Sequence, residues 1–172
     1  MRLRVCLAAA MLTLAGCSAK IVRVDMDAAR LAPTAASTVQ LACSYRLGLL
    51  TDARPAGSQA GGLNGNAFEF ADAAGVVRRQ LLAAGLQDSD GPVPVVAVRI
   101  MQLYLAQNLL TKVPVAVYEV AVAGRPPFLL RSQKASMNWN GTQNEAYAAY
   151  ALALADLNQQ LIERLNTDCA KG

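Results

Sequence analysis

The spacing of apolar residues changes several times along this 172-residue chain, and these changes constrain its fold more than any other feature. Residues 38–50 alternate between apolar and polar side chains, which is typical of a strand with one buried face. From residue 68 or 69 to 84, and again over 143–165, apolar residues recur at every third or fourth position. That spacing predicts two helices, each with one apolar face.

Three more strands are predicted between the helices, at residues 94–105, 113–122 and 128–139. The first is apolar at nearly every position, which is typical of a central strand. Short turns such as Gly124-Arg125-Pro126-Pro127 favour antiparallel pairing of the three. The predicted order is therefore strand, helix, three strands, helix. We expect an α+β two-layer sandwich, in which both helices cover one face of an antiparallel sheet of about four strands.

Small and polar residues mark the predicted ends of these elements. Gly85 suits the position just after the first helix, and Asn140-Gly141-Thr142 can supply the cap that begins the second. The glycine-rich segment 56–65 is expected to be a flexible loop. It lacks the strand–glycine–helix order and the Lys-Ser/Thr pair of a phosphate-binding loop, so we do not expect it to bind a nucleotide.

The first 17 residues have the layout of an export signal. Arg2 and Arg4 precede an apolar run at residues 5–14, which is too short to span a bilayer. The run leads into Leu14-Ala15-Gly16-Cys17, which resembles a bacterial lipobox. The resemblance implies a lipid on the Cys17 thiol, removal of residues 1–16, and acylation of the new amino terminus with a fatty acid such as palmitate. An ordinary secretory signal with an incidental Cys17 is the alternative.

The rest of the chain is expected to comprise a lipidated tether at residues 17–36 and a single α+β domain at residues 37–172. Alanine, proline, threonine and serine dominate the end of the tether, and residues 21–24 are a candidate for extended structure. Such a segment would let the domain stand away from the membrane. No run of 18 apolar residues follows Cys17, so the expected anchor is a lipid and not a polypeptide helix.

The four cysteines reduce to one candidate pair. Cys6 leaves with the signal and Cys17 carries the lipid, so Cys43 and Cys169 remain in a chain exported to an oxidising compartment. We predict that they form a disulfide, with Cys43 on the buried face of the first strand. Two free thiols are the alternative.

Composition argues against several classes of function. The net charge of +4 falls by two when Arg2 and Arg4 are removed, and the remaining basic residues are scattered, so we expect no nucleic-acid partner. The absence of histidine excludes Ser-His-Asp and Cys-His catalysis and removes the commonest zinc ligand. We predict no enzyme activity, metal or cofactor. The carboxylates considered as catalytic groups, none of which the spacing brings into a pair, are Asp52, Glu69, Asp72, Glu119 and Glu145.

Aromatic residues offer one candidate binding surface. Tyr104, Tyr118, Trp139 and Leu154 could line an apolar groove between helix and sheet that holds a lipid tail or a peptide of a partner. Packing of the same side chains in the core is the alternative.

Taken together, the chain resembles small proteobacterial outer-membrane lipoproteins of the YajG type. The resemblance rests on the lipobox, the strand end Thr51-Asp52-Ala53-Arg54, the helix end Leu81-Leu82-Ala83-Ala84-Gly85-Leu86, the three-strand meander and the closing Ala/Leu helix. The order of elements is also similar to that of auxiliary lipoproteins of ABC-type lipid transport. The Cys43 and Cys169 pair is not a feature of either group.

The resemblance implies a protein held by acyl chains on Cys17 at the periplasmic face of the outer membrane, since Ser18, and not aspartate, follows Cys17. It implies no catalytic residue. The expected role is a binding or assembly component of the cell envelope, with an envelope protein docking on a sheet edge or in the helix–sheet groove. The alternative role is an auxiliary, lipid-handling component of an ABC-type transport path.

Overall fold

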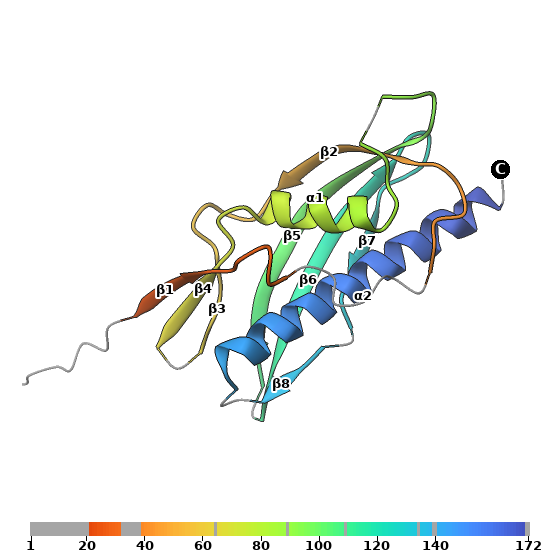
Figure 1. Ribbon diagram of the computed structural model, residues 1–172. Helices are drawn as coiled ribbons and strands as arrows, with labels where there is room; N and C mark the ends of the chain where they lie inside the picture. The colour runs from red at the N-terminus through yellow and green to blue at the C-terminus, as the bar shows by residue number, and fades with distance from the viewer. Residues whose placement is uncertain are drawn as a thin grey trace, which may run out of the picture.

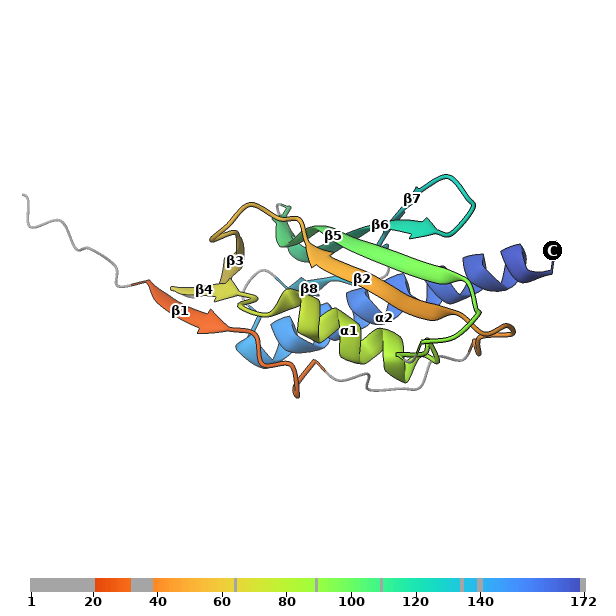
Figure 2. The ribbon, with the colours of Figure 1, turned by 90° about the horizontal axis from the view of Figure 1, so that it is seen from above.

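A five-stranded sheet with two helices on one of its faces forms the body of the protein, as Figures 1 and 2 show. The computed structural model describes residues 21–31, 39–63, 65–88, 90–108, 110–133, 135–138 and 141–170. The strands of the larger sheet run in the order β2-β5-β6-β7, and β8 pairs with β6. Their bounds are β2 Arg46–Asp52, β5 Val95–Gln107, β6 Thr111–Val122, β7 Phe128–Arg131 and β8 Met137–Asn138. The helices are α1 Ala73–Ala83 and α2 Gln143–Cys169.

The predicted α+β class, with two helices against one face of a sheet, is confirmed. Strands β5, β6 and β7 form the expected antiparallel meander. The pairing of β2 with β5 is parallel, so the sheet is mixed and not wholly antiparallel. The chain reaches β5 from β2 through a long crossover that contains α1, and such a crossover brings a strand back in the same direction.

Two β-bulges explain where the simple alternation in the sequence fails. Leu47 pairs with Val96 and Leu50 with Val98, so the extra residue turns Leu49 to the exposed face. A second bulge lies between Ile100 and Gln102 in β5. It returns the following apolar residues of β5 to the core, because each inserted residue shifts the side-chain register by one.

A second, three-stranded sheet lies at one end of the body, in the order β1-β4-β3. Its strands are β1 Val22–Asp25, β3 Gln59–Leu63 and β4 Asn66–Glu69. The glycine-rich segment expected to be a loop therefore contributes β3. Gly61 has a φ of 107°, and a Cβ at this position would lie 2.7 Å from the Cβ of Leu105. The missing side chain is thus what lets β3 approach β5 closely.

Capping residues set the ends of both helices. The side chain of Asp72 accepts a hydrogen bond from the Gly75 N–H, so α1 begins at residue 73, later than predicted, and the preceding residues pair as β4. Gly85 follows α1 with a φ of 106°, as predicted. Thr142 and Glu145 form a reciprocal capping box at the start of α2. This helix continues four residues beyond the predicted end, to Cys169.

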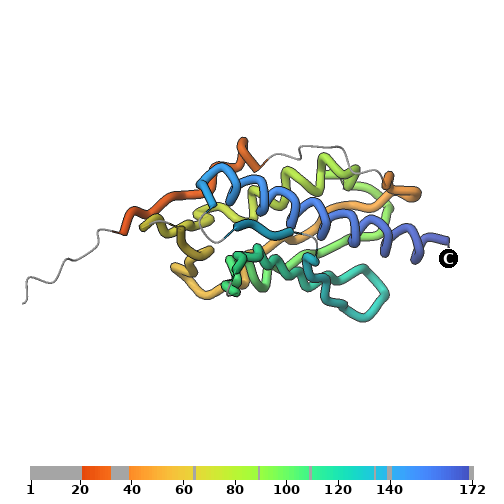
Figure 3. The backbone as a smooth tube through the Cα atoms, turned by 90° about the horizontal axis from the view of Figure 1, so that it is seen from below, coloured from red at the N-terminus to blue at the C-terminus, as the bar shows by residue number. Residues whose placement is uncertain are grey.

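The core lies between α2, α1 and the inner face of the five-stranded sheet, and Figure 3 shows both helices along the same side of the strands. The predicted apolar stripe of α2 is fully or almost fully buried along its length. Its members are Tyr147, Tyr150, Leu154, Leu157, Leu161 and Leu165. Tyr150 meets Phe70 edge-on, with ring centroids 5.1 Å apart.

Residues expected to form a tether belong to the fold, which corrects the predicted domain boundary. β1 pairs in parallel with β4, and Met26 and Leu31 are buried in the core. The amide of Gln80 donates to the Leu31 carbonyl across 2.7 Å. A strand paired on one side and two buried apolar side chains fix this segment, so any tether after Cys17 ends near residue 21.

Two buried tyrosines provide a matched test of this packing. Burial raises the pKa of both Tyr118 and Tyr150, so both stay neutral. The Tyr118 hydroxyl has no hydrogen-bond partner among the described residues, whereas the Tyr150 hydroxyl donates to the Ala60 carbonyl of β3. We predict that Tyr150→Phe lowers the free energy of unfolding by about 1 kcal/mol, while Tyr118→Phe leaves it unchanged or raises it. Urea unfolding of both variants measures the difference, and an equal loss in the two would contradict it.

Candidate functional site

The residues proposed to line an apolar groove do not meet in one place. Tyr118 and Leu154 are fully buried in the core between sheet and helix. Tyr104 pairs with Val115 on the opposite face of the sheet, and its side chain is 36% exposed. Trp139 lies outside the described residues. The space between α2 and the sheet is therefore occupied by core side chains at Tyr118 and Leu154, as in the core-packing alternative.

Each carboxylate considered as a catalytic group has a structural partner. Asp72 and Glu145 accept hydrogen bonds at the starts of the two helices. Glu119 pairs with Arg99 on the neighbouring strand at 3.0 Å, and this pair is largely exposed. The remaining partnerships are Asp52 with Arg54 at 2.7 Å and Glu69 with Arg23 at 3.1 Å. In these interactions each of the five is paired with an arginine or a backbone N–H, although Asp52 and Glu69 both line one hollow.

Arg54 is a charged residue with a largely enclosed side chain. Its side chain is only 6% exposed, and its Nε and Nη2 donate to the two carboxylate oxygens of Asp52 at 2.8 and 2.7 Å. Nη2 also donates to the Phe70 carbonyl at 3.2 Å, which ties the end of β2 to the segment after β4. The hydrogen bonds from Arg54 hold the pKa of Asp52 below its ordinary value, and they outweigh the opposing effect of burial.

A hollow of about 390 Å³ lies beside this pair, lined by the turn at residues 55–58 and by the end of β4. Both oxygens of Asp52 are engaged by Arg54, so the charges there are balanced. The motif Thr51-Asp52-Ala53-Arg54 noted in the sequence therefore fastens two strand ends together. Its chemistry is that of a structural ion pair with a shallow cavity beside it.

One end of the molecule gathers the start of β1 and several turns, and we call it the β1 end. It comprises Ile21, Val22, the β3–β4 turn at Gly65 and the β5–β6 turn that contains Leu110 (Figure 1). The Val22 N–H donates to the Gly65 carbonyl at 2.9 Å. Ile21, Val22 and Leu110 are 67%, 48% and 82% exposed, so large apolar side chains reach solvent here. The sequence indicated extended structure at residues 21–24, but it did not indicate an exposed apolar end or single out Leu110.

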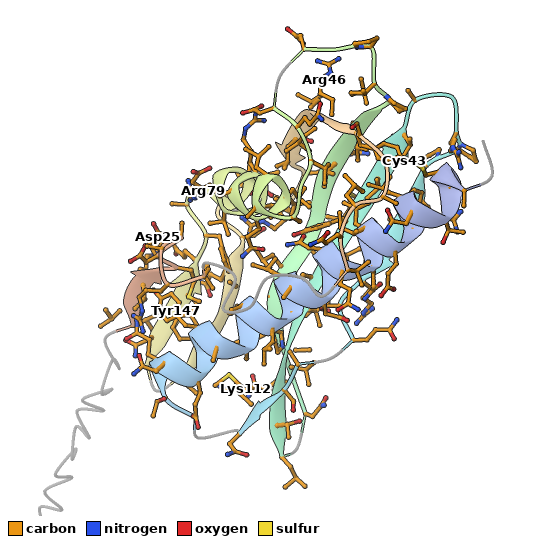
Figure 4. All side chains as sticks on the ribbon, turned by 45° about the vertical axis from the view of Figure 1, so that its right-hand side comes forward. Asp25, Cys43, Arg46, Arg79, Lys112 and Tyr147 are labelled. Atoms are coloured by element: carbon orange, nitrogen blue, oxygen red, sulfur yellow. A yellow bond between two sulfur atoms is a disulfide. The ribbon has the colours of Figure 1, made fainter. Side chains whose placement is uncertain are left out.

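The segment that follows β1 is clamped to the first turns of α2. The Tyr147 hydroxyl donates to the Asp25 carbonyl at 3.3 Å and accepts from the Asp27 N–H at 3.1 Å. The guanidinium of Arg30 lies 3.7 Å from the centre of the Tyr147 ring. Figure 4 shows Asp25 and Tyr147 together at this end, far from Cys43. The β1 end is therefore rigidly joined to the body.

The opposite end is held by Cys43 and Cys169, which the structure joins in a disulfide with Cα atoms 6.3 Å apart. Cys43 precedes β2 and is partly buried, and Cys169 ends α2. The same segments are joined by the Asn166 side chain, which accepts from the Ala42 N–H at 2.7 Å and donates to the Gln40 carbonyl at 2.8 Å. We call this region the disulfide end.

We call the face of the five-stranded sheet that is turned away from both helices the outer face (Figure 2). Exposed apolar side chains lie on this face. Leu49 and Leu129 are 72% and 67% exposed, and Tyr104 lies between their strands. Alternation along β6 places Val115 and Val117 on the same face, where both are buried. The alternation of apolar and polar residues along the strands could have predicted which side chains lie on this face. The bulge at Leu49 breaks that alternation, so the sequence alone places Leu49 on the wrong face.

Some predicted features fall outside the part of the chain that the structure describes. These are the signal at residues 1–16, Cys17 and Ser18. Neither described helix has the length and hydropathy needed to span a bilayer. No group of three or more histidine, cysteine or carboxylate side chains suited to a metal ion occurs within the described ranges.

Comparison with known proteins shows a shared fold. No family profile and no curated protein matches the chain. Among solved structures it is similar to protein XCC0632 from Xanthomonas campestris, described under family DUF330, with a TM-score of 0.53 and 10% identity over 88% of this chain and 99% of that one. A structure titled only as an uncharacterized protein gives a TM-score of 0.42 at 16% identity, over 76% and 95% of the two chains. At 10% identity, the similarity to XCC0632 shows a shared fold but not a shared function.

The Asp52–Arg54 pair makes stability depend on pH in a defined direction. Because folding lowers the pKa of Asp52, the pair stabilises the fold above the ordinary carboxyl pKa, and this contribution is lost as the pH falls through the lowered value. We predict that Arg54→Gln raises the pKa of Asp52, measured by NMR, and lowers the unfolding free energy most at neutral pH. Arg46→Gln is the control, since its partner Asp90 is 99% exposed. An unchanged Asp52 titration in Arg54→Gln would refute the assignment.

The disulfide closes a sequence separation of 126 residues. In the chain-entropy model, the double substitution Cys43→Ser/Cys169→Ser should lower the free energy of unfolding by about 5 kcal/mol. Thiol labelling of the unfolded, unreduced domain, with Cys17 acylated or absent, should find no reactive thiol until a reductant is added. Two reactive thiols before reduction would contradict the bridge.

Proposed function

We propose that this protein is a lipid-anchored, non-catalytic lipoprotein of the YajG type, held by acyl chains on Cys17 at the periplasmic face of the outer membrane. The observation that carries the proposal is the position of β1. Its first residue, Val22, lies only five positions after the lipobox cysteine and is already paired in a sheet. A lipid at Cys17 would thus be joined almost directly to a rigid element of the fold.

The non-catalytic part of the proposal is supported by the uses of the charged groups. The five carboxylates singled out in the sequence form caps or ion pairs, and the chain has no histidine. A general base or nucleophile needs a free reactive group beside an activating partner. The described residues hold these carboxylates in structural interactions instead.

We further propose that the outer face docks an envelope protein. Leu49, Tyr104 and Leu129 are three of the seven large apolar residues that are exposed in the described part of the chain. Large apolar side chains exposed on one face of a sheet occur at protein interaction sites. The lipid-handling alternative draws no support from Tyr118 and Leu154, because both are fully buried in the core.

The anchor is tested with Cys17→Ser. We predict that the wild-type protein is trimmed to residue 17, takes up labelled palmitate and sediments with outer membranes. The variant should keep residues 1–16, take up no palmitate and lose its outer-membrane fractionation, because no thioether can form. Intact mass and membrane fractionation measure both effects. A trimmed Cys17→Ser protein that still sediments with outer membranes would refute the anchor.

The docking proposal is tested in the same cells with a photo-crosslinking residue placed at Leu49 or Leu129. Arg79, exposed on α1 at the helix side, is the matched control position. Adducts of one defined mass at both outer-face positions, and none at position 79, are expected. Equal capture at all three positions, or capture at position 79 alone, would refute docking on the outer face.

A further inference from the structure

The distance from the proposed lipid to the fold is bounded by the chain itself. Ile21 lies four residues after Cys17. A fully extended chain advances at most about 3.6 Å per residue, so the Cα atom of Ile21 lies within about 14 Å of that of Cys17. This is much shorter than the domain, since α2 alone has 27 residues and at 1.5 Å per residue is about 40 Å long. The domain cannot turn freely above the bilayer on so short a link.

The β1 end also carries an unusual turn. The β5–β6 hairpin closes through a hydrogen bond from the Asn108 N–H to the Thr111 carbonyl at 2.9 Å, around the sequence Leu109-Leu110. Hairpin turns normally use glycine, asparagine or aspartate. Leu110 is 82% exposed, the highest value among the large apolar residues of the described chain. Transfer of such an exposed apolar side chain from water to an apolar environment is favourable.

Hydrogen bonds hold this turn and β1 in a fixed relation. Lys112, just after the turn, donates from Nζ to the Gly62 carbonyl of β3 at 2.5 Å. β3 pairs with β4, and β4 pairs with β1. Ile21 and Leu110 therefore belong to one rigid end of the molecule. Figure 1 shows β1, the β5–β6 turn and the start of α2 at this end, and the C-terminus of α2 at the other.

We infer that the β1 end rests on the lipid surface, with Ile21 and the Leu110 turn inserted at the boundary between headgroups and acyl chains. The inference rests on the proposed lipid at Cys17 and adds an orientation to it. α2 then rises from the membrane and presents the disulfide end about 40 Å away. The occupant is a bilayer because the short link from Cys17 brings this end, and no other, to the membrane.

The contact is apolar and does not depend on a basic patch. At this end Arg23 is paired with Glu69 at 3.1 Å, and the segment that carries Arg30 also carries the carboxylates of Asp25 and Asp27. A surface with balanced charges gains little from anionic lipids. The insertion is therefore expected in zwitterionic vesicles and at high salt alike.

The test uses the lipidated, mature protein in phosphatidylcholine vesicles, with and without brominated acyl chains, which quench nearby tryptophan. Trp139→Phe removes the native tryptophan, and single reporters are introduced as Ile21→Trp, Leu110→Trp and Leu129→Trp. We expect brominated lipid to reduce fluorescence at least about twofold at positions 21 and 110, because these side chains reach the acyl boundary. No change is expected at position 129 on the outer face. Equal quenching at 110 and 129, or none at 110, would overturn the orientation.

Failure of the orientation and failure of the anchor give different results. If the purified protein carries no lipid and does not float with vesicles, the anchor proposal falls and this inference falls with it. If it floats and position 110 is unquenched, the orientation alone is wrong.

A second measurement uses the wild-type sequence, so that the orientation can still be tested if the Trp139→Phe variants do not fold. Amide hydrogen exchange of the wild-type lipidated protein should slow at residues 22–25 and 110–112 when vesicles are added. Exchange at residues 123–127, in the β6–β7 turn, should not change. Slowing at 123–127 in place of the other two segments would overturn the inference.

Discussion

The burial of one face of α2 is the interaction on which the rest of this structure depends. Leu154, Leu157 and Leu161 are fully buried against the sheet. The alanines Ala146, Ala149 and Ala153 are also buried, and their small side chains let the helix lie close to the strands. Close packing over the full length of a helix gives a large apolar area removed from water, and this area is the dominant favourable term in folding.

The same helix fastens the outlying segments one after another. Tyr147 holds the chain after β1, Tyr150 holds β3, and Cys169 holds the segment before β2. α2 thus acts as a common support for parts that lie far apart in the sequence. Its start defines the β1 end and its last residue defines the disulfide end, so the long axis of the molecule follows the helix.

The position of β1 links this architecture to function. A strand that begins five residues after Cys17 leaves little free chain between the proposed lipid and the body. The shared fold with a DUF330 protein carries no assignment of role, because one fold supports many functions. The role must therefore be argued from surfaces: apolar residues at the β1 end, and the exposed outer face with Leu49 and Leu129.

Several features could be predicted from the sequence because they depend on local patterns. The period of the apolar residues predicted both helices and the β5–β7 meander, and Gly85 marked the end of α1. The pairing of Cys43 with Cys169 followed from counting the cysteines that remain after the predicted export signal and lipid attachment site are set aside. The candidate groove was drawn from Tyr104 and Tyr118, whose faces could not be assigned correctly without knowing the strand register.

The sequence by itself determined the element types, the α+β class and the absence of histidine chemistry, since these depend on short-range periodicity and composition. Only the tertiary structure decided that β2 runs parallel to β5, that bulges turn Leu49 outward, and that the glycine-rich segment becomes a strand packed on Leu105. It also decided that β1 belongs to the fold. Each of these features depends on contacts between residues far apart in the chain. The physical reason is that strand pairing must provide partners for backbone hydrogen-bonding groups and packing must fill the interior, and no local sequence pattern specifies which distant residues do so.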